Sequence, residues 1–159
     1  MKSILKLFLC CLSQVIVFSL FGQEDLHKLR VDAEKGNADA QYALGTYLFA
    51  GEKIKEDQTS AVKLFAKAAA QGHAKAQRKF EMCLCAGYGV KKNIPEGINW
   101  LIKAEKQGDA IAAYSLGGRY YHGDGVKKNV ELALKYLHKS AELGYPQARK
   151  VLKKLEAGE

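Results

Sequence analysis

The sequence predicts an all-α solenoid of helix-turn-helix repeats, and three observations lead to this fold class. Glycine recurs every 36 residues, at Gly36, Gly72, Gly108 and Gly144. An alanine follows four residues after each of these glycines and keeps the same interval. Inside each interval the apolar residues are spaced three or four apart, as on one face of a helix. A fixed period of this length, with helical spacing inside it, is typical of repeat architectures.

Composition and charge are those of a globular protein. The chain has 159 residues, of which 48% are hydrophobic and 26% are charged, and its two prolines permit long helices. Lys and Arg exceed Asp and Glu by 25 − 17 = 8. The basic residues are spread along the chain instead of forming one tail, so we expect no nucleic-acid partner.

The first 22 residues differ from the rest of the chain. Lys2 and Lys6 precede an uncharged, mainly apolar run from Leu7 to Gly22. This pattern is typical of a secretory signal peptide, and the run is shorter than the ~20 apolar residues of a membrane-spanning helix. We therefore expect residues 1–22 to be a signal peptide, with an uncleaved N-terminal membrane anchor as the alternative. The protein is then exported through the secretory pathway, and is periplasmic or secreted if its host is bacterial.

The remaining residues divide at the period of the glycines. Residues 23–37 align with the second helix of a repeat and are expected to form an N-terminal capping helix. Three repeats follow, and residues 145–159 align with a first helix and are expected to cap the other end. Stacked repeats need such caps because their shared core must be closed at both ends by a polar face. The expected repeats are 38–72, 73–108 and 109–144.

Each repeat is predicted to hold two helices. In the first repeat, Ala40, Leu44 and Leu48 fall on one face of the first helix. The second helix should begin at Asp57, Asn93 or Asn129 in the three repeats, because these side chains can accept from the free N–H groups of the first turn. Glu96 is expected to complete a capping box with Asn93.

The segment between the two helices resembles a phosphate-binding loop. GYGVKKN at 87–93 returns as GDGVKKN at 123–129. No strand is expected before these glycines and no Gly-Lys-Ser/Thr follows them, so a turn is the better interpretation and no cofactor is expected. The lysine pairs 91–92 and 127–128 are then a solvated edge, with a weak anion-binding ridge as the alternative. The glycines expected in turns are Gly36, Gly51, Gly72, Gly87, Gly89, Gly108, Gly123, Gly125 and Gly144.

Several motifs resemble a known family. ALGTYLFAG begins at Ala43, SLGGRYYHGDGVKKN at Ser115, and the second-helix segment ALKYLHKSAELG at Ala133. Together they are similar to the Sel-one-like repeat, a relative of the tetratricopeptide repeat. The resemblance implies a right-handed α/α superhelix of 36-residue repeats that mediates protein–protein interaction. The departures are Glu81, where the other copies have glycine, Cys83 and Arg119, where the pattern has tyrosine, and Lys53, where it has the second loop glycine.

The first helices of a curved helical array line its concave face. The exposed positions there are rich in aromatic residues, and Tyr and Arg recur as anchors in protein interfaces. We expect this face to bind a peptide or partner domain, whose identity the sequence does not specify, and we expect the protein to be a monomer. Packing against the adjacent repeat is the alternative for any of these side chains. The expected partner-binding residues are Tyr42, Thr46, Phe49, Arg78, Met82, Cys85, Tyr114 and Tyr121.

The resemblance also raises an enzymatic alternative, because some cysteine-rich bacterial members have been described as β-lactamases or penicillin binders. Ser60 and Lys63 spell Ser-x-x-Lys, but neither Ser-Asp-Asn nor Lys-Thr-Gly occurs. The paired cysteines of those members are missing too. We therefore expect a non-catalytic scaffold with no catalytic residues.

The remaining side chains with reactive or ligating chemistry give no further site. The histidines share no helix face, so no metal site is expected. Cys85 falls on the exposed column of its helix and Cys83 on the buried column, so of the two only Cys85 is a candidate for reactivity, and the sequence leaves open whether it is redox-active. The basic residues also suit contact with a membrane surface. The four histidines are His27, His73, His122 and His138.

Overall fold

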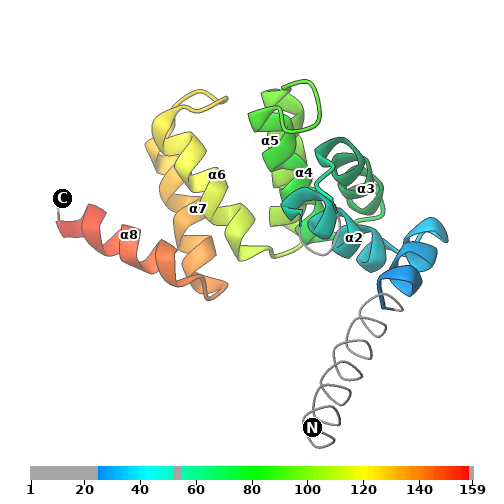
Figure 1. The fold of residues 1–159 in the computed structure, drawn as a ribbon. Coiled ribbons are helices and arrows are strands. Elements are labelled where there is room, and N and C mark those ends of the chain that lie inside the picture. Colours follow the sequence, from blue (N-terminus) through cyan, green and yellow to red (C-terminus); the bar gives the residue numbers. More distant parts are fainter. Residues whose placement is uncertain (1–24, 52–54, 158–159) are drawn as a thin grey trace, which may run out of the picture.

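The computed structural model describes residues 25–51 and 55–157, so the expected signal peptide lies outside the described residues. All regular secondary structure in this part is helical, which confirms the predicted all-α class (Figure 1). No helix in it is long and apolar enough to cross a membrane. Helical residues 25–34 come first. The helices that follow are α2 (Ala38–Ala50), α3 (Gln58–Ala70), α4 (Ala74–Ala86), α5 (Ile94–Lys106), α6 (Ala110–His122), α7 (Val130–Glu142) and α8 (Pro146–Ala157).

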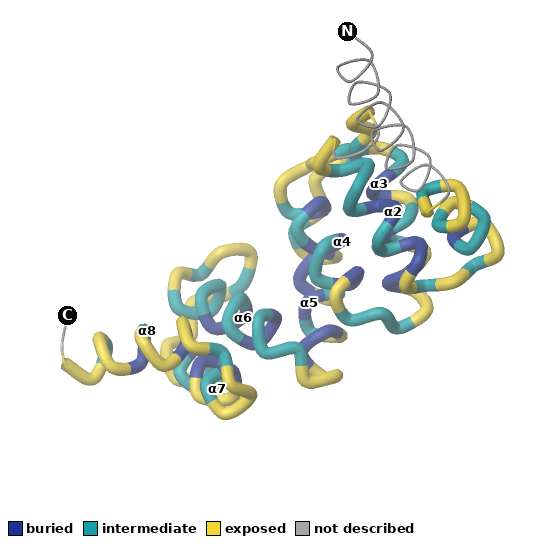
Figure 2. The backbone as a smooth tube through the Cα atoms, turned by 60° about the horizontal axis from the view of Figure 1, so that its bottom comes forward, coloured by how far each residue is buried: buried dark blue, intermediate teal, exposed yellow. Residues whose placement is uncertain are grey.

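The helices stack in chain order. α2 packs with α3, α4 with α5 and α6 with α7, and each of these hairpins then contacts the next helix along the chain. Figure 1 shows the hairpins arranged one after another from α2 to α7, with α8 at the end of the array. Buried residues lie where the helices meet, whereas α8 is largely exposed (Figure 2). This arrangement is a helical solenoid, in which each repeat contacts its neighbours.

Side-chain caps begin the second helices at the expected residues. Asp57, Asn93 and Asn129 each accept from the backbone N–H three residues later. The expected capping box at Asn93 is wrong in one respect. The backbone N–H of Asn93 donates to the carbonyl of Leu84, so the carboxylate of Glu96 accepts from the side-chain amide of Asn93, at 2.8 Å.

The core consists of one row of large apolar residues from the first helices and one from the second. The first row is at most 8% exposed at any position and continues into α8. Two aromatic residues at the edge of this core are only partly buried: Trp100 meets Phe80 edge-on, and Tyr136 stacks on Tyr120. The two rows are Leu44, Phe80, Leu116 and Leu152, and Phe65, Leu101 and Leu137.

One glycine lies at the crossing of each hairpin. A Cβ atom at Gly45 would lie 2.8 Å from Phe65, and one at Gly117 would lie 2.9 Å from Leu137. In the middle hairpin the first helix carries Glu81 at this position, and the glycine is instead Gly97 on the second helix, where a Cβ would lie 3.2 Å from the carbonyl oxygen of Glu81. Close approach of the two backbones therefore requires one residue without a side chain, on either helix.

The repeated glycine loops are turns that rest on the preceding repeat. Gly89 and Gly125 have φ of 61° and 74°, which a side chain resists. A Cβ at Gly89 would lie 2.5 Å from the carbonyl oxygen of Gln58, at the start of α3. One at Gly125 would similarly press on Ile94, at the start of α5. Their backbones are thus packed against helix starts, and all nine glycines expected in turns have positive φ.

Glutamine side chains join the first two junctions between repeats. Gln77 is buried and donates to the carbonyl of Ala69, at the end of α3. Its own carbonyl accepts from the amide of Gln107, at 2.8 Å. Gln41 and Gln71 repeat this arrangement one period earlier. Each bond gives a second donor to a carbonyl at a helix end, which also accepts from the N–H of Gly36 or Gly72 in the turn.

Candidate functional site

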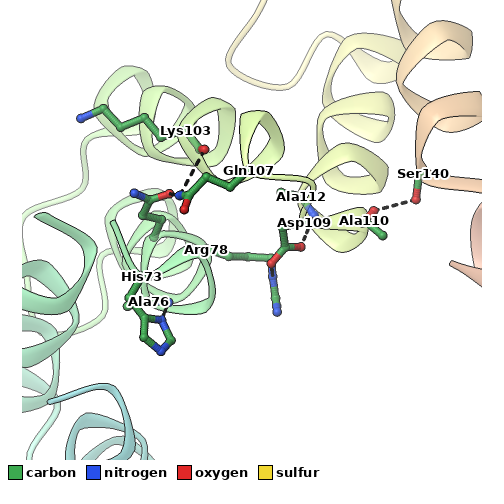
Figure 3. Close-up of polar contacts among 10 residues, drawn as sticks. His73, Ala76, Arg78, Lys103, Gln107, Asp109, Ala110, Ala112 and Ser140 are labelled. Carbon is green, nitrogen blue, oxygen red and sulfur yellow. Dashed lines mark hydrogen bonds and ion pairs between the residues drawn. The ribbon is translucent and has the colours of Figure 1, made fainter. Parts of the chain in front are cut away.

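Three of the expected partner-binding residues lie between neighbouring repeats. Tyr42 stacks on His73 with ring centroids 4.7 Å apart, and Tyr114 meets Tyr145 edge-on at 5.1 Å. Arg78 occupies the equivalent position in the second repeat, and its Nε lies 3.3 Å from Asp109 (Figure 3). Each of them therefore contacts the residue just before the next first helix. Part of each side chain therefore packs against the adjacent repeat, which was the alternative to partner binding.

Two of the contacted residues, His73 and Asp109, cap the helices that they precede. Nδ1 of His73 accepts from the N–H of Ala76 at 3.1 Å, and Asp109 accepts from the N–H of Ala112 at 2.9 Å (Figure 3). Because Nδ1 of His73 is an acceptor, the ring proton lies on Nε2, which is 3.1 Å from Asp39. The junctions between first helices are therefore held in place before any partner binds.

The other expected residues have different surroundings. Phe49 packs against Phe65 and meets the ring of Tyr88 edge-on at 5.8 Å. The hydroxyl of Thr46 donates to a carbonyl in its own helix. Met82 packs on the edge of the core. These side chains of the first and second repeats therefore already make contacts within the protein.

The third repeat is different because it has Gly118 at the position that Thr46 and Met82 occupy in the first two repeats. A Cβ atom there would meet nothing within 4 Å, so the surface of α6 is open at this point. Two hollows adjoin Gly118, and they share it with Ser115 and His122. We call the two hollows together the Gly118 groove.

The first hollow lies between α6 and α8 and is apolar. Its volume is about 220 Å³, and it contains two of the expected residues, Tyr114 and Tyr121. The amino group of Lys128 lies 5.8 Å from the ring of Tyr121. The full lining is Tyr114, Ser115, Gly117, Gly118, Tyr121, His122, Leu137, Val151 and Leu155.

The second hollow lies between α4 and α6 and is charged. Its volume is about 510 Å³, and it contains the expected residues Met82 and Cys85. The structure therefore brings four of the eight expected residues to the groove, two in each hollow. The full lining is Glu81, Met82, Cys85, Ala86, Ser115, Gly118, Arg119, His122 and Asp124.

An ion-pair cluster forms one wall of the second hollow. Arg119 binds Glu81 of the preceding repeat through one nitrogen and Asp124 through the other, the latter at 2.8 Å. The side chains of Glu81 and Arg119 are only 8% and 14% exposed, whereas Asp124 is 63% exposed. Burial acts against the charge of Arg119, but the hydrogen bond and charge of Glu81 outweigh it and raise the pKa of Arg119. Two of the residues that depart from the repeat pattern are thus partners.

The thiol of Cys85 is poorly suited to nucleophilic chemistry. Burial, with a smaller contribution from the charge of Glu81, raises its pKa to about 11. The more deeply buried Cys83 also has a pKa of about 11, again because of burial. Both thiols are therefore protonated at neutral pH, and the reactive form of a cysteine is the thiolate.

Ser60 does not have the surroundings of an activated nucleophile. It lies in the first turn of α3, where its backbone N–H donates to the capping Asp57 at 2.9 Å, and hydrogen bonding by Ser60 is the main cause of the lowered pKa of Asp57. Lys63 is exposed. Within residues 25–51 and 55–157, no group of three or more His, Cys, Asp or Glu side chains is placed to hold a metal ion.

The sequence patterns did not indicate most of the groove. Val151 and Leu155 belong to α8, which the repeat pattern identified only as a cap, and Leu137 is a core position of α7. Glu81 and Arg119 were noted as departures, but not as partners. The sequence feature that could have indicated the pairing is their opposite charge at a separation of one 36-residue period plus two residues.

The comparisons with known proteins agree with this architecture. A family model described as Sel1 repeat matches residues 38–73, 80–109 and 110–145. The chain belongs to the Sel1 repeat family. A search of curated proteins gives no match. Sel1 repeats generally mediate protein–protein interactions, and proteins built from them are typically non-catalytic scaffolds.

Solved structures with Sel1 repeats are similar to this chain. A Sel1 repeat protein from Oxalobacter formigenes is 32% identical, with a TM-score of 0.79 over 84% of this chain and 54% of its own. The protein c5321, a protective antigen present in uropathogenic Escherichia coli strains, is also 32% identical, with a TM-score of 0.74 over 77% of this chain and 26% of its own. The chain thus spans about half of the first protein and about a quarter of the second.

A third structure shares the fold alone. Cysteine rich protein B (hcpB) of Helicobacter pylori is 24% identical, with a TM-score of 0.66 over 80% of this chain and 94% of its own. These neighbours confirm the predicted helical solenoid.

Proposed function

We propose that this Sel1 repeat protein is a non-catalytic scaffold that binds an extended segment of a partner protein on its concave face, in the Gly118 groove. The observation that carries the proposal is the open position at Gly118. It joins an apolar hollow to a charged hollow across three successive first helices, α4, α6 and α8. A peptide that crosses these helices has an apolar contact and polar contacts within one groove.

The groove is largely ordered before a partner arrives. Tyr114 is held by Tyr145, and Arg119 is held by Glu81 and Asp124. Binding therefore costs little side-chain entropy, and Tyr and Arg are side chains that contribute strongly to interfaces. This supports recognition by a preformed surface.

Selection from a random displayed peptide library against the full chain tests the proposal. Peptides selected by the wild type are expected to lose binding to Tyr121→Ala, whose ring forms part of the apolar hollow. Phe49→Ala, the equivalent position in the first repeat, is the matched control and is expected to retain binding. Circular dichroism establishes that both variants are folded. Selected peptides that bind Tyr121→Ala as well as the wild type would place the binding site elsewhere.

We also propose that the chain is exported, with residues 1–22 as its signal peptide. The support is the sequence itself, in which Lys2 and Lys6 precede an uncharged apolar run. Expression in a bacterial host followed by intact mass measurement tests this. A shortened chain in the periplasm or medium is expected. A full-length chain that stays in the cytosol would contradict the proposal, and a full-length chain in the membrane fraction would identify an anchor instead.

A further inference from the structure

We infer that the Gly118 groove selects acidic peptide segments that present one large apolar side chain. The inference rests on the proposed function and gives the chemical class of the partner. Three features carry it: the size and lining of the apolar hollow, the charge around that hollow, and two polar side chains at the centre of the groove.

The apolar hollow suits a single side chain. Its volume of about 220 Å³ is below the roughly 300–1,000 Å³ of sites for drug-sized ligands. Tyr121, Leu137, Val151 and Leu155 surround it, and Gly118 leaves its centre open. Burial of one leucine or phenylalanine side chain of a partner contributes ~2 kcal/mol, or about 30-fold in affinity. The groove therefore distinguishes a peptide with an apolar anchor from one without it.

The net charge beside this hollow is positive, because Lys128, Lys150 and Lys154 outnumber Glu156, the exposed carboxylate that follows Leu155. Lys154 is three residues after Val151 and Lys150 is four residues before Lys154, so the two lysines lie one above the other along α8. Both are exposed, and neither forms a salt bridge within the described part of the chain. Lys128 adds a third amino group near Tyr121 and likewise has no salt bridge there.

The acidic residues of the groove do not offset these lysines. Glu81 and Asp124 are both bound to Arg119 on the far side of Gly118. A peptide whose apolar residue enters the hollow thus places its flanking residues near lysines that lack anionic partners. Carboxylates at those flanking positions complement the surface, and lysines there are repelled.

Two polar side chains are available for the peptide backbone. Ser115 and His122 belong to both hollows and adjoin Gly118. Within the described part of the chain neither side chain makes a hydrogen bond, and the ring of His122 meets the neighbouring Tyr121 ring edge-on. Both side chains can donate to or accept from a peptide group that passes over Gly118.

Fluorescence anisotropy with three short dye-labelled peptides tests the inference on the full chain. The probes have a central phenylalanine flanked by glutamates, the same phenylalanine flanked by lysines, and a central serine flanked by glutamates. The first is expected to bind at least about ten-fold more tightly than either of the others. Its affinity is also expected to fall as the salt concentration rises, because the lysines are exposed.

Two variants and a control locate the binding. Gly118→Leu fills the open position and is expected to abolish binding without lowering the melting temperature, because nothing lies within 4 Å of the added Cβ. Thr46→Leu, the equivalent position in the first repeat, is the control and is expected to bind as the wild type does. Lys150→Glu combined with Lys154→Glu is expected to weaken the glutamate-flanked probe about ten-fold and to strengthen the lysine-flanked probe.

The outcomes separate this inference from the proposed function. Tighter binding of the lysine-flanked probe that Gly118→Leu abolishes would overturn the acidic class and leave the groove as a peptide site. Binding of both glutamate-flanked probes that Gly118→Leu leaves unchanged would show attraction to surface lysines alone and overturn the inference. If no probe and no selected peptide responds to Gly118→Leu, the inference and the proposed function fail together.

Discussion

Replacement of Arg119 by methionine isolates the contribution of the ion pair that links the second and third repeats. The variant keeps an unbranched side chain of similar apolar stem but removes the guanidinium group and its charge. It leaves the carboxylate of Glu81, which is 8% exposed, without its salt-bridge partner in the described part of the chain. Loss of one member of a buried ion pair costs ~3–5 kcal/mol, because the remaining charge stays buried without compensation.

The structure predicts unequal effects at the two ends of this pair. Glu81→Ala leaves Arg119 bound to Asp124, which is 63% exposed, so the guanidinium keeps one partner and access to water. We expect Glu81→Ala to cost ~1–2 kcal/mol and Arg119→Met to cost at least ~3 kcal/mol. The double variant is expected to be more stable than Arg119→Met alone, because an apolar pair replaces an uncompensated charge.

Thermal unfolding followed by circular dichroism at a helix band measures these differences. In a domain of this size ~1 kcal/mol corresponds to about 4 °C, so Arg119→Met is expected to melt at least about 12 °C below the wild type. Asp124→Asn is the control, because it breaks only the exposed bridge and is expected to cost less than ~1 kcal/mol. Equal and additive losses for Glu81→Ala and Arg119→Met would refute the coupling between the two residues.

Three further predictions concern single positions. Gly118→Ala is expected to raise the melting temperature by about 4 °C, because alanine replaces a helical glycine at an open position. Gly117→Ala is expected to lower the melting temperature, because its Cβ would lie 2.9 Å from a carbon of Leu137. The opposite order of melting temperatures would contradict the packing around these two glycines. Iodoacetamide is expected to alkylate Cys85 at pH 8 at least about ten-fold more slowly in the folded chain than in urea. The rate in the folded chain is expected to rise as the pH approaches the Cys85 pKa of about 11. Site-resolved mass spectrometry measures these rates, and equal rates in the two conditions would show that the thiol is not buried. Ser60→Ala is expected to leave the hydrolysis of a chromogenic β-lactam at the level of buffer, as in the wild type, because Lys63 is exposed and neither Ser-Asp-Asn nor Lys-Thr-Gly accompanies Ser60. Turnover that the substitution removes would establish the enzymatic alternative.

Features that depend on one repeat at a time were predictable from the sequence. The starts of the second helices follow from side chains that can accept from a free N–H, and the row from Leu44 to Leu152 follows from helical spacing. The error at Glu96 has a specific cause. A capping box assumes that the backbone N–H of Asn93 is free, but the loop folds back and donates it to Leu84 of the preceding helix.

Features that depend on contact between repeats were not predictable in the same way. Side chains at the positions of Tyr42, Arg78 and Tyr114 bridge to the next repeat, yet the bridge is a ring stack, an ion pair and an edge-on ring contact in turn. The period identifies equivalent positions, but the chemistry at each junction depends on both partners. The groove has the same origin, because it combines an open glycine on α6 with apolar residues on α8.

The pairing of Glu81 with Arg119 limits how this chain can grow by duplication. A copy of residues 73–108 inserted after the original would place a second Cys83, instead of a guanidinium, opposite the first Glu81. That carboxylate would then be buried without a cation, at a cost of several kcal/mol. Duplication of residues 109–144 would have the reverse effect, because the added Arg119 would face a glycine. Units of equal length are therefore not exchangeable here, and the order of the second and third repeats is part of the information that specifies the fold.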